Sequence, residues 1–291
     1  MNDTRTLAWA GWKMTIPSSC FPLAITGAHE AGAMMVGTTS LAVMQIKWRI
    51  ASVPDDSTAW ALRRVKRILK HPVVQDAPAR FDSVLASDNA DINAASRLVW
   101  VGAMRTERLL VEIVMNVSAG KSAVKSFMSI TVPSIAGSDD GAVREWSIFD
   151  AFFAAPKDAR LVSRRLYAGD IMLSLADTRG RKLLLRQVYP ATLALERQPL
   201  AAWLSDNAVK RTMRRVSSLK DSPRGEHSVI RMGDHALPPP LSLFGRRYTA
   251  AAVTHDTARD RLLIAAEESH EPLTASSVDA LIERMKVQHV R

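Results

Sequence analysis

The sequence has little cysteine and no long apolar run. Its single cysteine, Cys20, excludes an intrachain disulfide and a zinc site built on several thiolates, and we expect it to fill space in a core. No stretch approaches the roughly 20 apolar residues of a membrane-spanning helix. The opening residues, MNDTRTLAWAGWK, are too polar for the core of a signal peptide. The sequence therefore predicts a cytoplasmic protein without a membrane span.

Motifs for cofactors are also missing. The segment SAGKSAV, at 118–124, ends as a phosphate-binding loop ends, but Met115 stands where such a loop needs its first glycine. His227 and His235 are eight residues apart, which matches no standard metal-ligand spacing. No GxSxG motif accompanies His255 to suggest a nucleophilic serine. We therefore expect no nucleotide, no metal and no other cofactor.

What the sequence does have is the composition of a folded protein with a localised positive charge. At 291 residues, of which 47% are apolar, the chain is long enough for two domains with their own cores. The net charge is +10, and the segment 157–224 carries 15 basic and 6 acidic residues, which is +9 of that total. A concentrated basic surface favours a polyanionic partner, which is nucleic acid, an acidic protein or a membrane surface.

The two halves of the chain contain similar short motifs in the same order. In LAWAGWKMTIPSSCFPL and in EWSIFDAFFAAPKDARL, two aromatic residues are followed by a proline and a leucine. An Ala-Gly pair comes after each of these stretches, at 31–32 and at 168–169. An apolar run follows in each half, and then a segment with Ala-Trp and Val-Lys-Arg, STAWALRRVKRIL in one half and LAAWLSDNAVKRTM in the other. We interpret this as a diverged tandem duplication with repeats at 1–141 and 142–291. The alignment pairs Trp60 with Trp203, Gly32 with Gly169, Arg97 with Arg247 and Arg108 with Arg261.

Each repeat predicts strands, a helix, further strands and a second helix. The first helix begins behind Asp55-Asp56-Ser57, whose side chains can accept free amide protons, and ends before Pro72; its counterpart spans about 200–219. The closing helix, at 274–287, has an apolar face of Val278, Leu281, Ile282 and Met285, with a weaker counterpart at 121–130. Because tight turns join the strands, we expect the α+β class: two tandem copies of a mostly antiparallel sheet packed with helices.

The order of elements resembles that of a known family. An aromatic strand, a proline, an apolar strand with Ala-Gly, a helix and further hairpins are similar to the start of PsbP-like α/β sandwich domains, and also to uncharacterised prokaryotic proteins with a Trp-rich strand. The resemblance implies a protein that binds partners rather than one that catalyses a reaction. This chain differs because it is duplicated and lacks an export signal, so the resemblance implies no photosynthetic role.

Basic residues gather on the first helix of each repeat. In the second repeat, Lys210 with Arg214 and Arg211 with Arg215 are spaced i and i+4, which places four cations on the outward side of the predicted helix. Arg63 and Arg67 are arranged similarly in the first repeat, and Trp48, between Lys47 and Arg49, has the setting of an aromatic that stacks on a base. These residues are the predicted binding site for a polyanion, although a solvated helix face would look the same.

Three classes of function are compatible with these features. The one we favour is a non-catalytic binding or scaffold protein, with nucleic acid or a ribonucleoprotein as its polyanionic partner. The second is an enzyme with a pocket between the repeats that uses His255, or His227 with His235. The third is a structural subunit of a larger assembly, which would have an exposed apolar patch.

Overall fold

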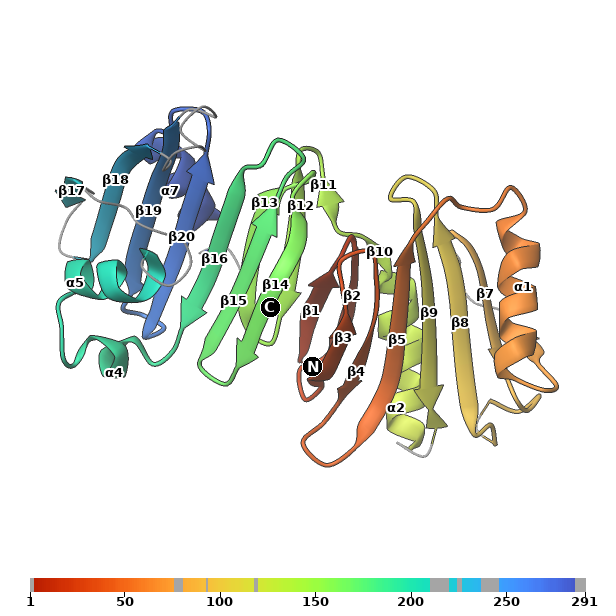
Figure 1. Cartoon of the computed structure of the whole chain (residues 1–291). Helices are drawn as coiled ribbons and strands as arrows, with labels where there is room; N and C mark the ends of the chain where they lie inside the picture. Colours follow the sequence, from red (N-terminus) through yellow and green to blue (C-terminus); the bar gives the residue numbers. More distant parts are fainter. Residues whose placement is uncertain are drawn as a thin grey trace. The chain divides into compact units, whose positions relative to one another are not determined.

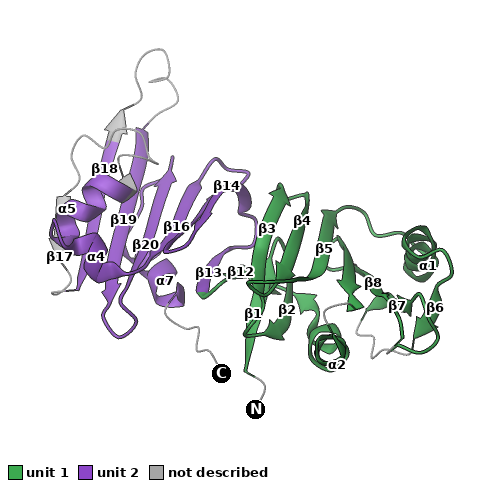
Figure 2. Cartoon of the chain, turned by 90° about the horizontal axis from the view of Figure 1, so that it is seen from below, with its two compact units in different colours: residues 1–150, 289–291 green, residues 151–288 purple. Residues whose placement is uncertain are grey.

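The computed structural model describes most of the chain, and every structural statement below concerns the described residues. These are residues 3–75, 81–92, 94–117, 120–209, 220–223, 227–236 and 246–285. The chain forms two compact units, residues 1–150 and residues 151–288 (Figure 2). Antiparallel strands dominate and a few helices pack on them, so the predicted α+β class is confirmed (Figure 1).

The main sheet of unit 1 has seven strands, and each neighbouring pair is antiparallel. Across the sheet the order is β3 (Phe21–Gly27), β4 (Ala31–Gly37), β5 (Ala42–Ile50), β9 (Leu109–Asn116), β8 (Arg97–Met104), β7 (Asp82–Ser87) and β6 (Val73–Gln75). The helix α1 (Ser57–Ile68) packs on β7 and β8. On the other side of the sheet lies α2 (Lys121–Ser126), which continues through the π-helical turn η2 (Phe127–Thr131) into α3 (Val132–Ser134) (Figures 1 and 2).

A second, smaller sheet of unit 1 begins with the first residues of the chain. Its strands lie in the order β10 (Ala136–Gly137), β2 (Trp12–Pro17), β1 (Thr4–Trp9), β12 (Val143–Ile148) and β11 (Asp139–Asp140). Trp9, Trp12 and Trp146 are fully buried there, so the aromatic landmarks of the sequence form a core. The predicted repeat boundary, between 141 and 142, falls in the turn that joins β11 to β12 and stays a prediction about the repeats.

Unit 2 has a main sheet with the same strand order. Its strands are β14 (Arg160–Tyr167), β15 (Asp170–Ala176), β16 (Lys182–Val188), β20 (Arg261–Ser269), β19 (Arg246–Asp256), β18 (Ser228–Ala236) and β17 (Lys220–Pro223). Its other elements are β13 (Ala151–Pro156), α4 (Ala191–Leu195), α5 (Leu200–Leu204), the π-helical turn η3 (Ser205–Val209) and α7 (Ala275–Met285). The helix α7 packs on β13, β18, β19 and β20, and α4 and α5 lie on the other face of the sheet (Figure 1).

Two identical strand orders in one chain are expected of a tandem duplication. Trp60 and Trp203 occupy the same position, since each is the fourth residue of its helix. The amide of Trp60 donates to the carbonyl of Asp56 at 3.1 Å, and that of Trp203 donates to the carbonyl of Pro199 at 3.0 Å. This part of the predicted alignment agrees with the structure.

Other pairs of the predicted alignment are shifted by one or two residues. The amide of Ile50 donates to the carbonyl of Glu30 at 2.6 Å, and at the same place in unit 2 the amide of Tyr189 donates to the carbonyl of Gly169 at 2.8 Å. Glu30 is therefore the counterpart of Gly169, and Gly32 is not. The short loop before the second strand of each main sheet differs in length between the units. The two Ala-Gly pairs, although alike in sequence, therefore do not occupy equivalent positions.

A second shift concerns the turn before the last strand of each sheet. Arg108 and Asp260 both have φ 52° in this turn. Their carbonyls accept equivalent hydrogen bonds, from the amide of Ala51 at 2.8 Å and from the amide of Ala191 at 2.7 Å. Asp260, rather than Arg261, is therefore the counterpart of Arg108. Because β8 and β19 lead into these turns, the predicted pairing of Arg97 with Arg247 is shifted as well.

Local chemistry sets the helix ends where the sequence predicted them. The carboxylate of Asp56 accepts the amide proton of Ala59 at 2.8 Å and caps α1, which stops at Ile68. In α7 the predicted apolar face of Val278, Leu281, Ile282 and Met285 is buried. The helix predicted at about 200–219 is α5 continued by η3 as far as Val209. The rest of that span lies outside the described residues.

Candidate ligand-binding groove

On the face of the unit 1 main sheet that carries α1, this helix covers only some of the strands. The core beneath α1 consists of residues from α1, β7 and β8: Ala61, Val65, Leu69, Val84, Ala86, Val99 and Val101. None of the described residues of β4 or β5 belongs to this cluster. On these strands and on β9, the same face of the sheet carries two adjoining cavities of about 680 and 410 Å³. We call the pair of cavities the unit 1 groove.

The groove is centred on an ion triplet built from three elements. Glu112 on β9 is paired in register with Lys47 on β5, and both line both cavities. The Glu112 side chain is 8% exposed; one carboxylate oxygen lies 3.6 Å from Nζ of Lys47 and the other accepts from Nε of Arg64 at 2.6 Å. A carboxylate so deeply buried needs such partners, because an unpaired buried charge is strongly destabilising. Lys47 and Arg64 are 46% and 40% exposed and face the groove.

Further cations stand around this triplet. Arg49 and Arg67 line the smaller cavity, and Arg97 lines the larger one. All three side chains are exposed, and within the described parts of the chain no ion pair joins them to an acidic residue. Five cations therefore surround one carboxylate in the groove lining. Because several like charges in one concave surface add their fields, the groove attracts anions.

The smaller cavity also has apolar walls. Trp60 of α1 is half-buried and lines it, together with Leu110 of β9 and with Ala31 and Gly32 of β4. Cations and an apolar wall in one cavity suit a ligand that carries both anionic and apolar groups.

Of the predicted binding residues that the structure describes, only some lie in the groove. Arg67 lines the groove, whereas Arg63 is exposed on α1 and is not part of its lining. Trp48 is 3% exposed; its indole N–H donates to the carbonyl of His29 at 3.2 Å, and its ring packs against that of Trp12 with centroids 6.3 Å apart. Trp48 is among the residues that line the smaller cavity, but a side chain with so little exposed surface offers little room for a base to stack. Lys210, Arg211, Arg214 and Arg215 lie outside the described residues.

The sequence analysis did not identify most of the groove, although two features of the sequence indicated it. In LAVMQIKWR the residues Gln45, Lys47 and Arg49 alternate with buried apolar ones, which is the pattern of a strand with one face in water. Glu112 gave a second signal, as the only charged residue in the apolar strand LLVEIVMN. Nothing in the sequence shows that β5 and β9 are neighbours or that Arg64 of α1 reaches Glu112 on β9.

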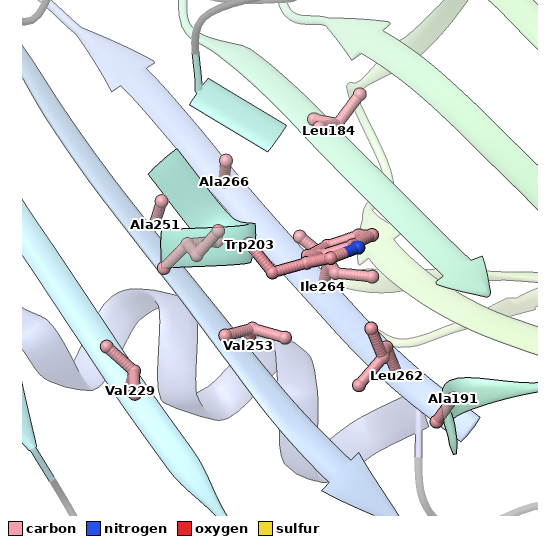
Figure 3. Packing of buried hydrophobic residues seen from close by; sticks show 10 residues of the cluster. Leu184, Ala191, Trp203, Val229, Ala251, Val253, Leu262, Ile264 and Ala266 are labelled. Carbon is pink, nitrogen blue, oxygen red and sulfur yellow. The ribbon is translucent and has the colours of Figure 1, made fainter. Parts of the chain in front are cut away.

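Among the described residues of unit 2, α4, α5 and η3 cover the same face of the sheet. Arg186 on β16 is the counterpart of Lys47, and it donates to both carboxylate oxygens of Asp170 at 2.7 and 2.9 Å and to the carbonyl of Asn207 at 3.3 Å. Its guanidinium lies 5.4 Å from the ring centroid of Trp203. Trp203 in turn lies over Ile264 of β20, within a buried cluster that includes Leu184 of β16 (Figure 3). The Arg186 side chain is therefore fully engaged within its own unit.

Two histidines of the rival enzyme hypothesis, His227 and His255, are close together. The rings of His227 and His255 are in edge contact with centroids 5.9 Å apart, and Nε2 of His255 lies 3.8 Å from a carboxylate oxygen of Asp260. That carboxylate, however, accepts from the amide and the hydroxyl of Thr192 at 2.8 and 2.9 Å. The amide hydrogen bond is the main reason why the pKa of Asp260 is lowered. The main contacts of the Asp260 carboxylate thus connect the turn before β20 to the start of α4.

A metal site and a membrane helix have no support in the described residues. No group of three or more His, Cys, Asp or Glu side chains among them is arranged to hold a metal ion, and the side chain of His235 lies outside the description. No helix in the same part of the chain is long and apolar enough to cross a membrane.

The similarity of this chain to known proteins is weak. No family model and no curated protein matches the chain. Among solved structures, the Ran-binding protein Mog1p of Saccharomyces cerevisiae is a weak neighbour, with a TM-score of 0.34 and 10% identity over 51% of this chain and 95% of that one. The predicted resemblance to PsbP-like domains is not confirmed by these comparisons.

Proposed function

We propose that this chain is a non-catalytic binding protein whose anionic partner docks in the unit 1 groove. One observation carries the proposal: the groove is open and cationic, while on the same face of unit 2 the described helices α4 and α5 pack on the sheet. Arg186 of unit 2 is fully occupied by Asp170, Trp203 and Asn207. Its counterpart, Lys47, shares one buried carboxylate with Arg64 and faces solvent.

The geometry supports binding better than catalysis. Both cavities lie in unit 1, and their only carboxylate, Glu112, is already neutralised by Lys47 and Arg64. A general acid or base needs a group that can exchange a proton with the substrate, and neither cavity lining contains a histidine. The enzyme alternative therefore rests on the histidines of unit 2, either His255 or the pair of His227 and His235. The third alternative, a structural subunit, would use the groove as a subunit contact.

A salt titration tests the proposal with two anionic probes, a fluorescent single-stranded oligonucleotide and poly-glutamate. We expect both to bind, with affinity falling as salt rises, because binding releases counterions from the probe. For the oligonucleotide, the logarithm of affinity should fall with a slope of about −0.7 for each phosphate that is neutralised.

The variant Arg49→Glu with Arg67→Glu tests whether this binding uses the groove. The variant should lose binding at about 50 mM salt, where screening is still weak. The matched control is Arg179→Glu with Arg197→Glu, which makes the same change in net charge at exposed positions of unit 2. Binding that is absent in the wild type, or that both variants lose equally, would contradict the proposal, provided that circular dichroism shows all three proteins folded.

A further inference from the structure

Unit 2 contains a helix for which unit 1 has no counterpart. After β16 the chain runs from Tyr189 to Pro199 before α5 begins, and this connection includes α4. After β5 the corresponding connection is only 51–56. Both connections start with equivalent hydrogen bonds, made by the amides of Ala51 and Ala191, and unit 2 already has one additional residue, Pro190, between Tyr189 and this bond.

In unit 2, α4 covers the end of the sheet that β16 and β20 share. Ala191 is buried in the same cluster as Leu262, and Ala194 and Leu195 pack against this cluster, as does Val188. The hydrogen-bond equivalences described above make Arg49 the counterpart of Val188 and Leu110 the counterpart of Leu262. Arg49 and Leu110 are walls of the smaller cavity of unit 1. That cavity therefore lies where unit 2 places α4.

The residues around this place have changed in charge between the units. Unit 1 has Arg49 where unit 2 has Val188, and it has Arg108 where unit 2 has Asp260. The Asp260 carboxylate accepts the amide proton of Thr192 at the start of α4. The exposed guanidinium of Arg108 can only donate, so it suits a carboxylate or the carbonyl end of a helix instead.

We propose that unit 1 binds a short, acidic helical segment of a partner protein in the smaller cavity, at the place that unit 2 fills with its own α4. This inference rests on the proposed function and names the partner of the same groove. The apolar side of the segment packs on Trp60 and Leu110, and its carboxylates meet Arg49, Arg67 and Arg108. The mode is that of an amphipathic helix in a groove.

Two features favour a protein segment over nucleic acid. The buried Glu112 carboxylate at the floor takes up Lys47 and Arg64, which leaves fewer cations for a continuous run of phosphates, whereas a helix can place an apolar side chain or an amide there. In addition, Trp48, the aromatic that the sequence placed among the cations, is buried against Trp12 and His29. A base therefore has little room to stack on Trp48.

The test uses two synthetic peptides of roughly 15 residues, a length at which an isolated helix is marginal in water. The first consists of Glu, Leu and Ala, with glutamates at i and i+4 on one side and leucines on the other. The second has the same charge and two central prolines, which prevent the helix. By fluorescence anisotropy we expect the first peptide to bind the wild-type protein at least about tenfold more tightly than the second. It should also bind more tightly than the single-stranded oligonucleotide.

Two variants test separately whether the charge of this cavity and the space within it are needed for binding. Arg49→Glu with Arg108→Asp gives unit 1 the acidic turn residue of unit 2 and should weaken the helical peptide by about tenfold or more. Ala31→Trp adds bulk to the lining without a change of charge and should weaken the same peptide while leaving oligonucleotide binding in place. The matched control, Ala142→Trp, adds the same bulk at an exposed position away from both cavities and should bind like the wild type.

Each outcome decides one of the two proposals. If neither peptide nor the oligonucleotide binds in a manner that depends on Arg49 and Arg67, the proposed function itself is wrong. If the oligonucleotide binds through these residues and the helical peptide does not, the function stands and the helical partner is overturned. Equal binding of the two peptides, or no effect of Ala31→Trp, likewise overturns the inference that the cavity takes a helix.

Discussion

Gly32 lies directly beside the indole ring of Trp48, and the absence of its side chain is what makes room for the ring. A β-carbon at Gly32 would overlap both the ring of Trp48 and the carbonyl oxygen of Thr26. The backbone of Gly32 is not in the left-handed region, so the requirement is one of space. Gly169, in contrast, is a turn residue with φ 81°. The two Ala-Gly pairs of the sequence thus use glycine for different reasons.

Gly32→Ala should therefore destabilise unit 1 by roughly 1–3 kcal/mol or more, because the core must shift to admit the methyl group. Chemical denaturation followed by fluorescence measures this loss. The comparison variant is Gly141→Ala, at φ 58° with open space around the position, where we expect about 1 kcal/mol from backbone strain alone. If Gly32→Ala is as stable as the wild type, the packing of Trp48 on this glycine is wrong.

The two equivalent tryptophans should differ in their contribution to stability. Trp203→Ala removes a ring from the closed cluster of unit 2 and should cost roughly 3–5 kcal/mol. Trp60→Ala removes a half-buried ring that borders the open groove and should cost about 1–2 kcal/mol. Urea unfolding of both variants gives the two values, and a larger loss for Trp60→Ala would mean that the groove is closed in solution.

Asp170 should make part of the stability of unit 2 dependent on pH. Burial by itself raises the pKa of Asp170, but the hydrogen bonds and charge of Arg186, and then those of Arg165, outweigh burial and hold the pKa below its ordinary value. A lowered pKa in the folded state stabilises the fold above the unfolded value of about 4. This contribution is lost as the pH falls through the lower, folded value.

The variant Asp170→Asn should accordingly be less stable than the wild type at pH 7, and the difference should shrink below about pH 4. Thermal unfolding across this pH range measures it. Asp158→Asn, at an exposed position of the same unit, serves as the control and should follow the wild type throughout. A gap between wild type and Asp170→Asn that persists at about pH 2 would show that the ion pair is not its source.

Cys20 should react slowly with thiol reagents in the folded protein. The side chain is 5% exposed, and burial raises its pKa, which hydrogen bonding to Ser19 and the charge of Arg5 offset only in part. Less thiolate therefore forms at about pH 7–8, and access is poor. Reaction with an aromatic disulfide reagent should be slow in buffer and fast in urea. An Ala142→Cys variant that also carries Cys20→Ser should react fast in both solvents.

Features that depend on neighbours in the chain were determined by the sequence alone. The cap at Asp56 and the apolar face of α7 are local patterns, because a side chain contacts the backbone or side chains a few residues away. The hairpins and the α+β class follow from alternating apolar residues between turn residues for the same reason. The repeated order of landmarks also indicated two copies of one sheet, and the shared strand order is consistent with that interpretation.

The binding surface was decided by the tertiary structure, because it joins residues that are far apart in the chain. Lys47, Arg64 and Glu112 come from a strand, a helix and a later strand, and only the pairing of β5 with β9 brings them together. The same pairing turns the ring of Trp48 inward, since adjacent residues of a strand face opposite sides of the sheet. The presence of α4 in one unit and the short connection in the other then determine which face stays open, because burial depends on what covers a surface and not on the residues of that surface alone.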